Sequence, residues 1–413
     1  MACNLCDLKK NAREIISQYN ELNQPLAFWL FNTQALEDAV ARWHAAMPSV
    51  RPCYAIKCNP LPEIVKVLGD MGCGWDCATI NEIKEVIKLG FDVKDVVFSQ
   101  TFKPFDELVE AYELGVPHAT VDSISEVEKM AKYAPNMGVI VRVSADDKTA
   151  EHSLGEKFGL HEEEIEPVIA KIKELGLKMT GTHFHVGTGA HSPEAFREAM
   201  TISRNTFALG EKYGFAPRIV DIGGGFSQIP EFEMFGTVIE QAIKDLKFPE
   251  GTIFKAEPGR YMAVNCLNLC CSIHGKRNRV KDGEEVREYI TGDGIHGSLA
   301  FVATFHKELP CVAVTKCCKE EKFPSIIYGP TCNGSDKTFH GDFPEMTPGQ
   351  DWIMYPNVGA YTMSLATNFN GYQMKNHKMY ILPGTQFKTI ELPEDIQKYG
   401  IPALSGQPLN WSL

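Results

Sequence analysis

Short apolar runs alternate with segments of helical spacing along the first two thirds of the chain. The apolar runs are Cys53–Lys57, Gly74–Ala78, Val96–Ser99, Ala119–Asp122, Val139–Val143, Gly181–Val186, Ile219–Gly223 and Ile253–Glu257. Between them, apolar residues recur three and four positions apart, as on the buried face of a helix, in Leu61–Met71, Ile80–Leu89, Phe105–Leu114, Ser125–Tyr133, Glu163–Leu175 and Pro193–Tyr213. Eight strands that alternate with helices predict a closed parallel barrel, the (β/α)₈ or TIM-type fold.

After about residue 265 the helical spacing fades and β-type runs replace it. These runs are Asn265–Ile273, Tyr289–Thr291, Cys311–Val314, Ile326–Tyr328, Trp352–Tyr355 and Met379–Ile381. Turn residues such as Lys281-Asp282-Gly283 separate them. The pattern predicts a barrel over residues 33–265 and a second, mostly-β domain over residues 266–413, which residues 1–32 are expected to join.

Composition narrows the class of protein. The chain has 413 residues, 44% of them hydrophobic and 23% charged, which is ordinary for a globular protein of two domains. A net charge of −12 argues against a nucleic-acid or membrane-surface partner. The apolar stretch Leu26–Phe31 is too short to span a bilayer. Polar residues interrupt the start of the chain and the 13 cysteines are odd in number, so we expect a cytoplasmic protein with reduced thiols.

Two patterns raise the question of a metal. Cys3 and Cys6 form a C-x-x-C pair, but no second pair follows at zinc-ribbon spacing. His183 and His185 lie two positions apart, so both rings face the same side of a strand. No carboxylate or cysteine cluster lies near them in sequence. We predict no metal, an imidazole that stacks on a flat cofactor for His185, and a satisfied core histidine for His183.

Polar residues fall at one end of the predicted strands. They lie at or just past the C-terminal residue of six strands, at Lys57, Asp76, Arg142, His185, Gly223–Gly225 and Glu257. In a (β/α)₈ barrel this face carries the active site. The distribution therefore predicts an enzyme whose site is built from these side chains.

Lys57 ends the apolar run Cys53–Lys57, and Asn59-Pro60 stops that run. A lysine at the end of a buried strand is costly to desolvate unless it is paired or chemically converted. One such conversion is a Schiff base with an aldehyde cofactor, which a lysine of lowered pKa can form. The alternative is a lysine whose ammonium reaches solvent.

Two motifs after the last two strands suit a phosphorylated ring. Gly223, Gly224 and Gly225 follow the seventh strand, where barrels bind phosphate and where glycine lets backbone N–H groups approach an anion. Arg260 follows the eighth strand and can complete that phosphate site. Glu257 needs a positive partner if it is buried, and a protonated pyridine nitrogen would suit it.

Seven motifs in one order make the chain resemble the eukaryotic-type ornithine decarboxylases, pyridoxal-phosphate enzymes of the alanine-racemase-like fold. The resemblance covers about residues 25–385. The motifs are YAIKCN (54–59), WDCATINE (75–82), HFHVGTG (183–189), DIGGGF (221–226), AEPGRY (256–261), GPTCNGSD (329–336) and VGAYT (358–362).

The resemblance implies roles for the cofactor-binding residues. Lys57 would form the Schiff base with pyridoxal phosphate, His185 would stack on its ring, and Glu257 would bind the pyridine nitrogen. The phosphate would be held by Gly223, Gly224, Gly225, Arg260, Thr188 and Tyr361. Asp76, Glu82 and Arg142 would line the cofactor pocket.

The resemblance also implies a homodimer with composite sites. Cys332 would reach into the partner's site and protonate Cα after carbon dioxide leaves. Lys157 and Asp336 match positions that pair across that interface. An antizyme-like regulator is an open possibility for a further partner.

Two departures from the family pattern concern the substrate. Asn333 and Phe305 stand where the family has aspartates that contact the distal ammonium of ornithine. Each lost charge-assisted hydrogen bond removes roughly 1.5–3 kcal/mol. L-Ornithine remains the expected substrate, with putrescine as product at the first step of polyamine biosynthesis. The departures also predict weak sensitivity to ornithine-shaped suicide inhibitors.

Three other functions stay open. The first is decarboxylation of lysine, arginine or a neutral amino acid, which the departures at Phe305 and Asn333 motivate. The second is a racemase of the same fold, although racemases place an arginine where Glu257 stands. The third is a non-catalytic regulator like the antizyme inhibitors, which would need neither Lys57 nor Cys332.

Overall fold

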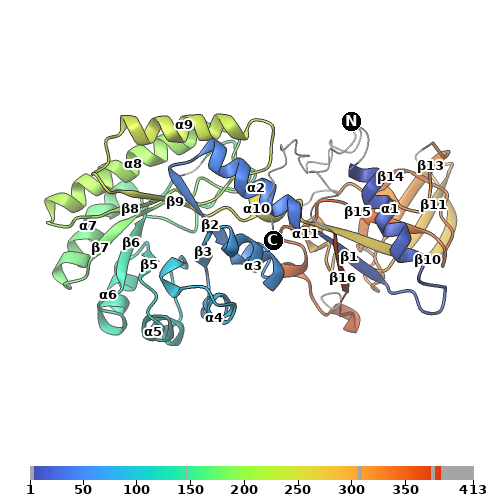
Figure 1. Cartoon of the computed structure of the whole chain (residues 1–413), viewed down its shortest axis with the longest axis horizontal. Coiled ribbons are helices and arrows are strands. Elements are labelled where there is room, and N and C mark those ends of the chain that lie inside the picture. The colour runs from blue at the N-terminus through green and yellow to red at the C-terminus, as the bar shows by residue number, and fades with distance from the viewer. Residues whose placement is uncertain (1–3, 146, 306–308, 318, 374–376, 383–413) are drawn as a thin grey trace. The chain divides into compact units, whose positions relative to one another are not determined.

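The computed structural model describes residues 4–145, 147–305, 309–317, 319–373 and 377–382. The chain divides into two compact units (Figure 1). One unit is formed by residues 39–262, and the other by the described parts of residues 1–38 and 263–413.

The first unit is a closed barrel of parallel strands, as the alternating pattern predicts. Consecutive strands pair from β2 to β9, and β2 pairs with β9 to close the ring. The strands are β2 (Val50–Ala55), β3 (Gly74–Cys77), β4 (Val96–Phe98), β5 (His118–Val121), β6 (Gly138–Arg142), β7 (Met179–His183), β8 (Ile219–Asp221) and β9 (Ile253–Ala256). Most of their residues are buried, because side chains fill the inside and helices cover the outside.

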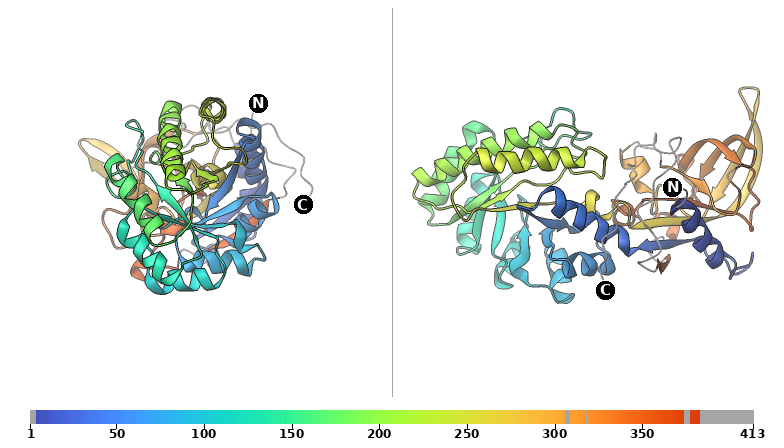
Figure 2. Two further views of the ribbon diagram at one scale, coloured as in Figure 1. Left: turned by 90° about the vertical axis from the view of Figure 1, so that its left-hand side faces the viewer. Right: turned by 45° about the horizontal axis from the view of Figure 1, so that its top comes forward.

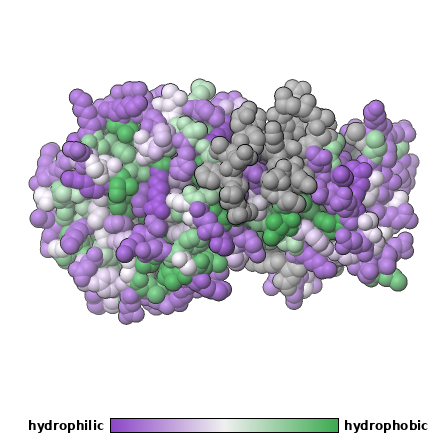
Figure 3. All heavy atoms as spheres, viewed as in Figure 1, coloured by the Kyte–Doolittle hydropathy of each residue, from purple (hydrophilic) through white to green (hydrophobic). Residues whose placement is uncertain are grey.

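Helices surround the strands (Figure 2). They are α2 (Thr33–Ala46), α3 (Pro62–Asp70), α4 (Ile80–Lys88), α5 (Phe105–Glu113), α6 (Ile124–Tyr133), α7 (Glu162–Glu174), α8 (Pro193–Lys212) and α9 (Phe232–Asp245), with the short turns η1 (Ile56–Cys58) and η2 (Val93–Asp95). In α4 the predicted periodicity places Ile80, Ile83 and Val86 in the interior. Hydrophilic residues predominate on the face of this unit seen in Figure 3.

The second unit is mostly β, also as predicted. Its sheet has the order β12-β15-β10-β11-β13-β14, and β1 pairs with both β10 and β16. The strands are β1 (Ala27–Asn32), β10 (Leu267–Lys281), β11 (Glu284–Thr291), β12 (Val312–Ala313), β13 (Lys322–Tyr328), β14 (Lys337–Pro344), β15 (Trp352–Tyr355) and β16 (Lys378–Leu382). The sequence pattern did not predict β14, whereas the N-terminal segment does join this sheet, through β1.

Helices and turns complete the second unit. They are α1 (Asn4–Ile16), α10 (Arg260–Ala263), which begins in the barrel unit, α11 (Ala300–Phe305), η3 (Met363–Leu365) and η4 (Phe369–Gly371). Leu8 and Ala12 of α1 belong to the same buried cluster as Phe28 and Trp352 of the sheet. The turn between β10 and β11 has positive φ at Asp282 (52°) and Gly283 (86°), as a two-residue type I′ hairpin requires.

The structure bears on two expectations from composition, the absence of a membrane span and the reduced thiols. No helix in the described part of the chain is both long and apolar enough to cross a membrane. Ten cysteines of the described residues form no disulfide, but Cys6 is disulfide-bonded, so the expectation of reduced thiols is wrong for this residue. Cys3 lies outside the described residues.

Candidate active site

Polar side chains gather at the C-terminal ends of the barrel strands. Asp76 lies near the end of β3, and Ser99 follows β4 directly. Three strands end in a polar residue, β6 at Arg142, β7 at His183 and β8 at Asp221, and Glu257 directly follows β9. In a closed parallel barrel these ends meet on one face, which is where barrel enzymes carry their active sites.

Lys57 lies at this face, but not within a strand. β2 ends at Ala55, and Lys57 lies in the turn η1 with 46% of its side chain exposed. Its ammonium pairs with the fully buried Asp76, whose other oxygen accepts a hydrogen bond from Ser99. A buried carboxylate is stable when it is paired in this way. The placement of Lys57 within the strand is therefore wrong, whereas its amine is both accessible and paired with Asp76.

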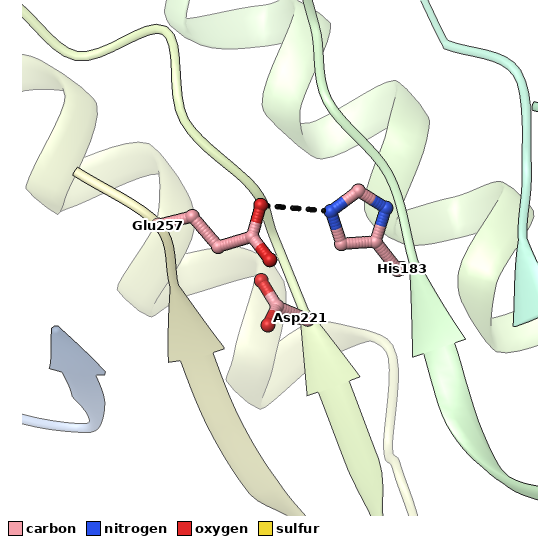
Figure 4. A group of neighbouring side chains, drawn as sticks. All are labelled: His183, Asp221 and Glu257. Atoms are coloured by element: carbon pink, nitrogen blue, oxygen red, sulfur yellow. Dashed lines mark hydrogen bonds and ion pairs between the residues drawn. The ribbon is translucent and has the colours of Figure 1, made fainter. Parts of the chain in front are cut away.

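A second polar group lies inside the barrel, at the ends of β7, β8 and β9 (Figure 4). His183 Nε2 is 3.0 Å from Glu257 Oε2, and Asp221 lies beside them, with one atom of each group within 4.8 Å of the others. His183, Asp221 and Glu257 are all buried. Three of their polar atoms have no hydrogen-bond partner among the described residues, namely His183 Nδ1, Asp221 Oδ2 and Glu257 Oε1.

Burial shifts the pKa values of these three groups, because it disfavours every charged form. It raises the pKa of Glu257 to about 8, an effect that nearby Asp76 reinforces, and that of Asp221 to about 7, reinforced by Glu257. It lowers the pKa of His183 to about 4, and Arg142 adds to the shift. Because the imidazole is neutral, the contact between His183 and Glu257 is a hydrogen bond rather than an ion pair.

His185 follows β7 and lies beside the glycines after β8. Its Nδ1 accepts a hydrogen bond from the backbone N–H of Gly187 (3.1 Å), and desolvation holds its pKa well below the usual value. The ring is therefore neutral and carries its proton on Nε2. A Cβ built on Gly224 would lie 2.8 Å from this nitrogen, so glycine at 224 is what leaves room for the imidazole.

The three glycines after β8 form a tight loop. Gly223 and Gly225 have φ of 63° and 101°, and a Cβ there would lie 2.1 Å from the Phe184 oxygen or 2.6 Å from the Gly187 oxygen. Phe226 anchors the end of the loop by stacking on Phe196, with ring centroids 4.7 Å apart. The backbone of the loop is thus fixed by close contact with the segment from Phe184 to Gly187.

Glu82 has a structural role that was not predicted for it. Its Oε2 accepts a hydrogen bond from the Ala78 N–H (2.6 Å), while the Thr79 hydroxyl accepts one from the Glu82 N–H. These two bonds satisfy the N–H groups of Glu82 and Ala78 at the start of α4. The pattern Thr79-x-x-Glu82 is visible in the sequence, and a cofactor-lining role for Glu82 stays a prediction.

The other predicted barrel residues lie around the same strand ends. Arg142 is buried and its guanidinium lies over the ring of Phe158, 4.6 Å from the centroid. Thr188 forms an isolated antiparallel bridge with His152. Arg260 begins α10.

The β unit carries the loop of the motif GPTCNGSD. Cys332 is exposed, and its backbone N–H donates to Asn370 Oδ1 (2.8 Å). The side-chain amide of Asn333 is engaged at both ends: Oδ1 accepts from the Ser335 N–H (2.9 Å), and Nδ2 lies 2.7 Å from His296 Nε2. Asn333 thus has a fixed orientation and keeps at most one acceptor site on its oxygen.

Asp336 is buried in the same loop, with 1% of its surface exposed. Its carboxylate accepts hydrogen bonds from the Ile295 N–H (2.8 Å) and from the backbone and hydroxyl of Thr331 (3.2 and 2.5 Å). These contacts give Asp336 a role in shaping its own unit, beside the predicted pairing with Lys157 at an interface.

The three remaining predicted residues lie outside the two polar groups described above. Lys157 lies in an exposed turn of the barrel unit. Tyr361 has a positive φ of 56° in the motif VGAYT. Phe305 is the last residue of α11, and its side chain lies outside the part of the chain that the structure describes.

The family model described as "Pyridoxal-dependent decarboxylase, pyridoxal binding domain" matches residues 33–264. The chain belongs to the pyridoxal-dependent decarboxylases. This membership agrees with the resemblance of the seven motifs, and it makes the chain a decarboxylase that uses pyridoxal phosphate.

Known members of this family match nearly the whole chain. "Ornithine decarboxylase 2" of Drosophila melanogaster is 35% identical over 381 residues, which cover 91% of this chain and 96% of the relative. The crystal structure of ornithine decarboxylase from Entamoeba histolytica is 47% identical, with a TM-score of 0.78 and coverage of 91% and 99%. The structure of an arginine decarboxylase from Paramecium bursaria Chlorella virus is 33% identical, with a TM-score of 0.85 and coverage of 91% and 100%.

Proposed function

We propose that this decarboxylase converts L-ornithine to putrescine and carbon dioxide. One observation carries the mechanistic part of this proposal: the buried carboxyl of Glu257 has one oxygen, Oε1, without a hydrogen-bond partner in the described structure. Such an acceptor fits a protonated pyridine nitrogen. An arginine at this position would repel that charge and favour racemisation, so Glu257 supports decarboxylation.

The residues present also suit the rest of pyridoxal phosphate. Lys57 offers an accessible amine beside Asp76, and we assign it the covalent link to the cofactor aldehyde. The loop of Gly223, Gly224 and Gly225 follows β8, where barrels bind phosphate, and we assign the phosphate to this loop together with Arg260. His185, neutral and set by Gly187, is assigned to the face of the ring. Thr188 and Tyr361 are assigned to the phosphate.

When bound, pyridoxal phosphate supplies an electron sink for the electron pair that remains when carbon dioxide departs. The protein contributes position and protons. Asp76 holds the Lys57 ammonium at the mouth of the barrel. Glu257 keeps a carboxyl oxygen available for the ring nitrogen, and a cation there would stabilise its ionised form. Arg142 and Glu82 are assigned to the pocket wall.

Homology and loop chemistry support a composite site in a homodimer. Cys332 is exposed on the β unit, and we assign it to deliver a proton to Cα in the site of the other subunit. Lys157 and Asp336 are assigned to the same interface. We place the enzyme in the cytoplasm, and an antizyme-like protein is the regulator that the family suggests.

The substrate assignment rests on the ornithine decarboxylases of Entamoeba and Drosophila, at 47% and 35% identity. The arginine decarboxylase at TM-score 0.85 makes arginine the second candidate. The amide of Asn333 already binds Ser335 and His296. It therefore keeps one acceptor site, on Oδ1, for the distal end of a substrate.

Carbon dioxide release from ornithine, with lysine, arginine and leucine run in parallel and pyridoxal phosphate added, tests the proposal. A clear preference for ornithine supports it. Release from a different amino acid, with ornithine inert, would assign a changed specificity to the loop of Asn333 and to Phe305. Absence of the cofactor's absorbance in the reconstituted protein would instead support a non-catalytic regulator.

A further inference from the structure

His183 is a buried histidine that contacts Glu257, the residue assigned to the pyridine nitrogen of the cofactor. It ends β7 inside the barrel, 1% exposed, with Nε2 at 3.0 Å from Glu257 Oε2. A neutral imidazole has one N–H and one lone pair, and here Nδ1 has no hydrogen-bond partner in the described chain. An unsatisfied buried nitrogen is costly, and such groups in native proteins call for a functional reason.

The hydrogen bond to His183 makes the two oxygens of Glu257 unequal. Oε2 is engaged by the imidazole, and Oε1 is not engaged by any described residue. The Glu257 backbone is fixed as well, since its N–H donates to the Gly223 oxygen (2.7 Å). Glu257 is thereby held at its backbone and at its carboxyl group, and Oε1 is the oxygen without a described partner.

Other charged groups face this pair from the neighbouring strand ends. Asp221, from β8, uses Oδ1 to accept the Gly223 N–H (3.0 Å), and its Oδ2 has no hydrogen-bond partner among the described residues. Burial lowers the pKa of His183 to about 4, and Arg142 and Lys57 lower it further, whereas Asp221 and Asp76 raise it. The neutral ring is therefore favoured by burial and by the two cations, against the two carboxylates. A neutral ring has a single proton, which it can donate to Oε2 from Nε2.

We propose that His183 is a positioning residue that acts through Glu257: it donates from Nε2 to Oε2, fixes the carboxyl, and leaves Oε1 as the oxygen that receives the pyridine nitrogen of pyridoxal phosphate. The inference rests on the cofactor assignment of Glu257 and adds the protein group that orients it. It replaces the expectation that His183 is a satisfied core histidine. The consequence is tighter cofactor binding, because the carboxyl need not be ordered when the cofactor arrives.

Two substitutions separate the hydrogen bond from the packing. His183→Leu keeps an apolar side chain of similar volume and removes the donor, whereas His183→Gln keeps an N–H donor at similar reach. His118→Leu is the matched control, because His118 is also a barrel histidine, at the start of β5, and contacts Thr180 rather than a site residue. Each protein is stripped of cofactor, and its dissociation constant for pyridoxal phosphate is measured by fluorescence alongside thermal unfolding.

We expect His183→Leu to bind pyridoxal phosphate at least tenfold more weakly, and His183→Gln and His118→Leu to stay within about threefold of the parent. In the holoenzyme, kcat should fall in His183→Leu while KM for the amino acid changes little, since the residue does not touch substrate. If His183→Leu does not fold, His183→Asn, whose amide is too short to reach Oε2, takes its place with the same expectation.

A folded His183→Leu or His183→Asn protein with the parent's cofactor affinity overturns the role of His183. So does a tenfold loss of affinity in a normally folded His183→Gln protein. These outcomes differ from failure of the proposed function, in which the parent itself would bind no pyridoxal phosphate or release no carbon dioxide.

Discussion

Replacing Gly224 by alanine tests whether the glycine loop and the rest of the site form one packed unit. The added Cβ would lie 2.8 Å from His185 Nε2 and 2.9 Å from the Glu257 backbone oxygen, whereas ordinary contacts begin at 3.4 Å. Neither neighbour moves freely. The His185 ring is tied to the Gly187 N–H, and the Glu257 backbone is tied to Gly223. Both groups must therefore shift by about half an ångström.

Overpacking of this kind costs about 1–3 kcal/mol. A Gly→Ala change also stabilises by about 0.4–1 kcal/mol through the unfolded state, so the net loss is about 0–2.6 kcal/mol. We expect a lower unfolding temperature in the cofactor-free protein and at least tenfold weaker binding of pyridoxal phosphate. The measurements are thermal unfolding and titration of cofactor fluorescence.

Gly275→Ala in β10 is the control, because its Cβ would meet only the Ile290 side chain at 3.4 and 3.6 Å. This variant should match the parent in cofactor affinity and be equal or slightly higher in stability. Our account of the loop would be refuted if Gly224→Ala behaved like Gly275→Ala in both measurements.

Three further predictions concern the proton donor, the substrate and pH. Lys57→Ala should remove the absorbance of the covalently held cofactor, and Cys332→Ala should retain it but lower turnover; mixing the two inactive proteins should restore part of the activity, and no recovery would contradict shared sites. Asn333→Asp should lower KM for ornithine and increase sensitivity to ornithine-shaped suicide inhibitors, with an unchanged inhibition constant counting against a substrate role. Burial raises the pKa of Glu257 from 4.5 to about 8 and that of Asp221 from 3.8 to about 7, so the folded cofactor-free protein holds protons that the unfolded chain has lost. Its stability should therefore decline as pH rises from about 6.5 to 8, and urea unfolding that is flat over this window would contradict the raised pKa values.

The barrel could be predicted because its signal is local. Each strand is a short run of buried residues, and the run at 74–78 became β3 (Gly74–Cys77) with an error of one residue. β14 (Lys337–Pro344) was missed because its segment mixes polar residues, two phenylalanines and a glycine, and is ordered through its pairing with β13. Backbone pairing with a neighbouring strand leaves no side-chain periodicity that the sequence can display.

In the site, too, the features with a local sequence signal could be predicted, and those that depend on the closed barrel could not. The positions of Asp76, Arg142 and Glu257 at strand ends followed from the pattern of the chain. The partner of His183 did not, because it lies 74 residues away in sequence and becomes a neighbour only when the barrel closes. The end of the first barrel strand was also predicted wrongly, since β2 ends two residues before Lys57 and the turn η1 carries this lysine out of the strand.

The backbone of Gly223 has a consequence for how the enzyme selects among forms of its cofactor. Its N–H is bound by Asp221, and its oxygen receives the Glu257 N–H. The groups assigned to the phosphate and to the ring nitrogen therefore belong to one hydrogen-bonded segment and cannot move apart independently. With these assignments, the loop and Glu257 would hold the phosphate and the ring nitrogen at a fixed separation. A vitamer without its phosphate, or with a longer arm, would engage one end only.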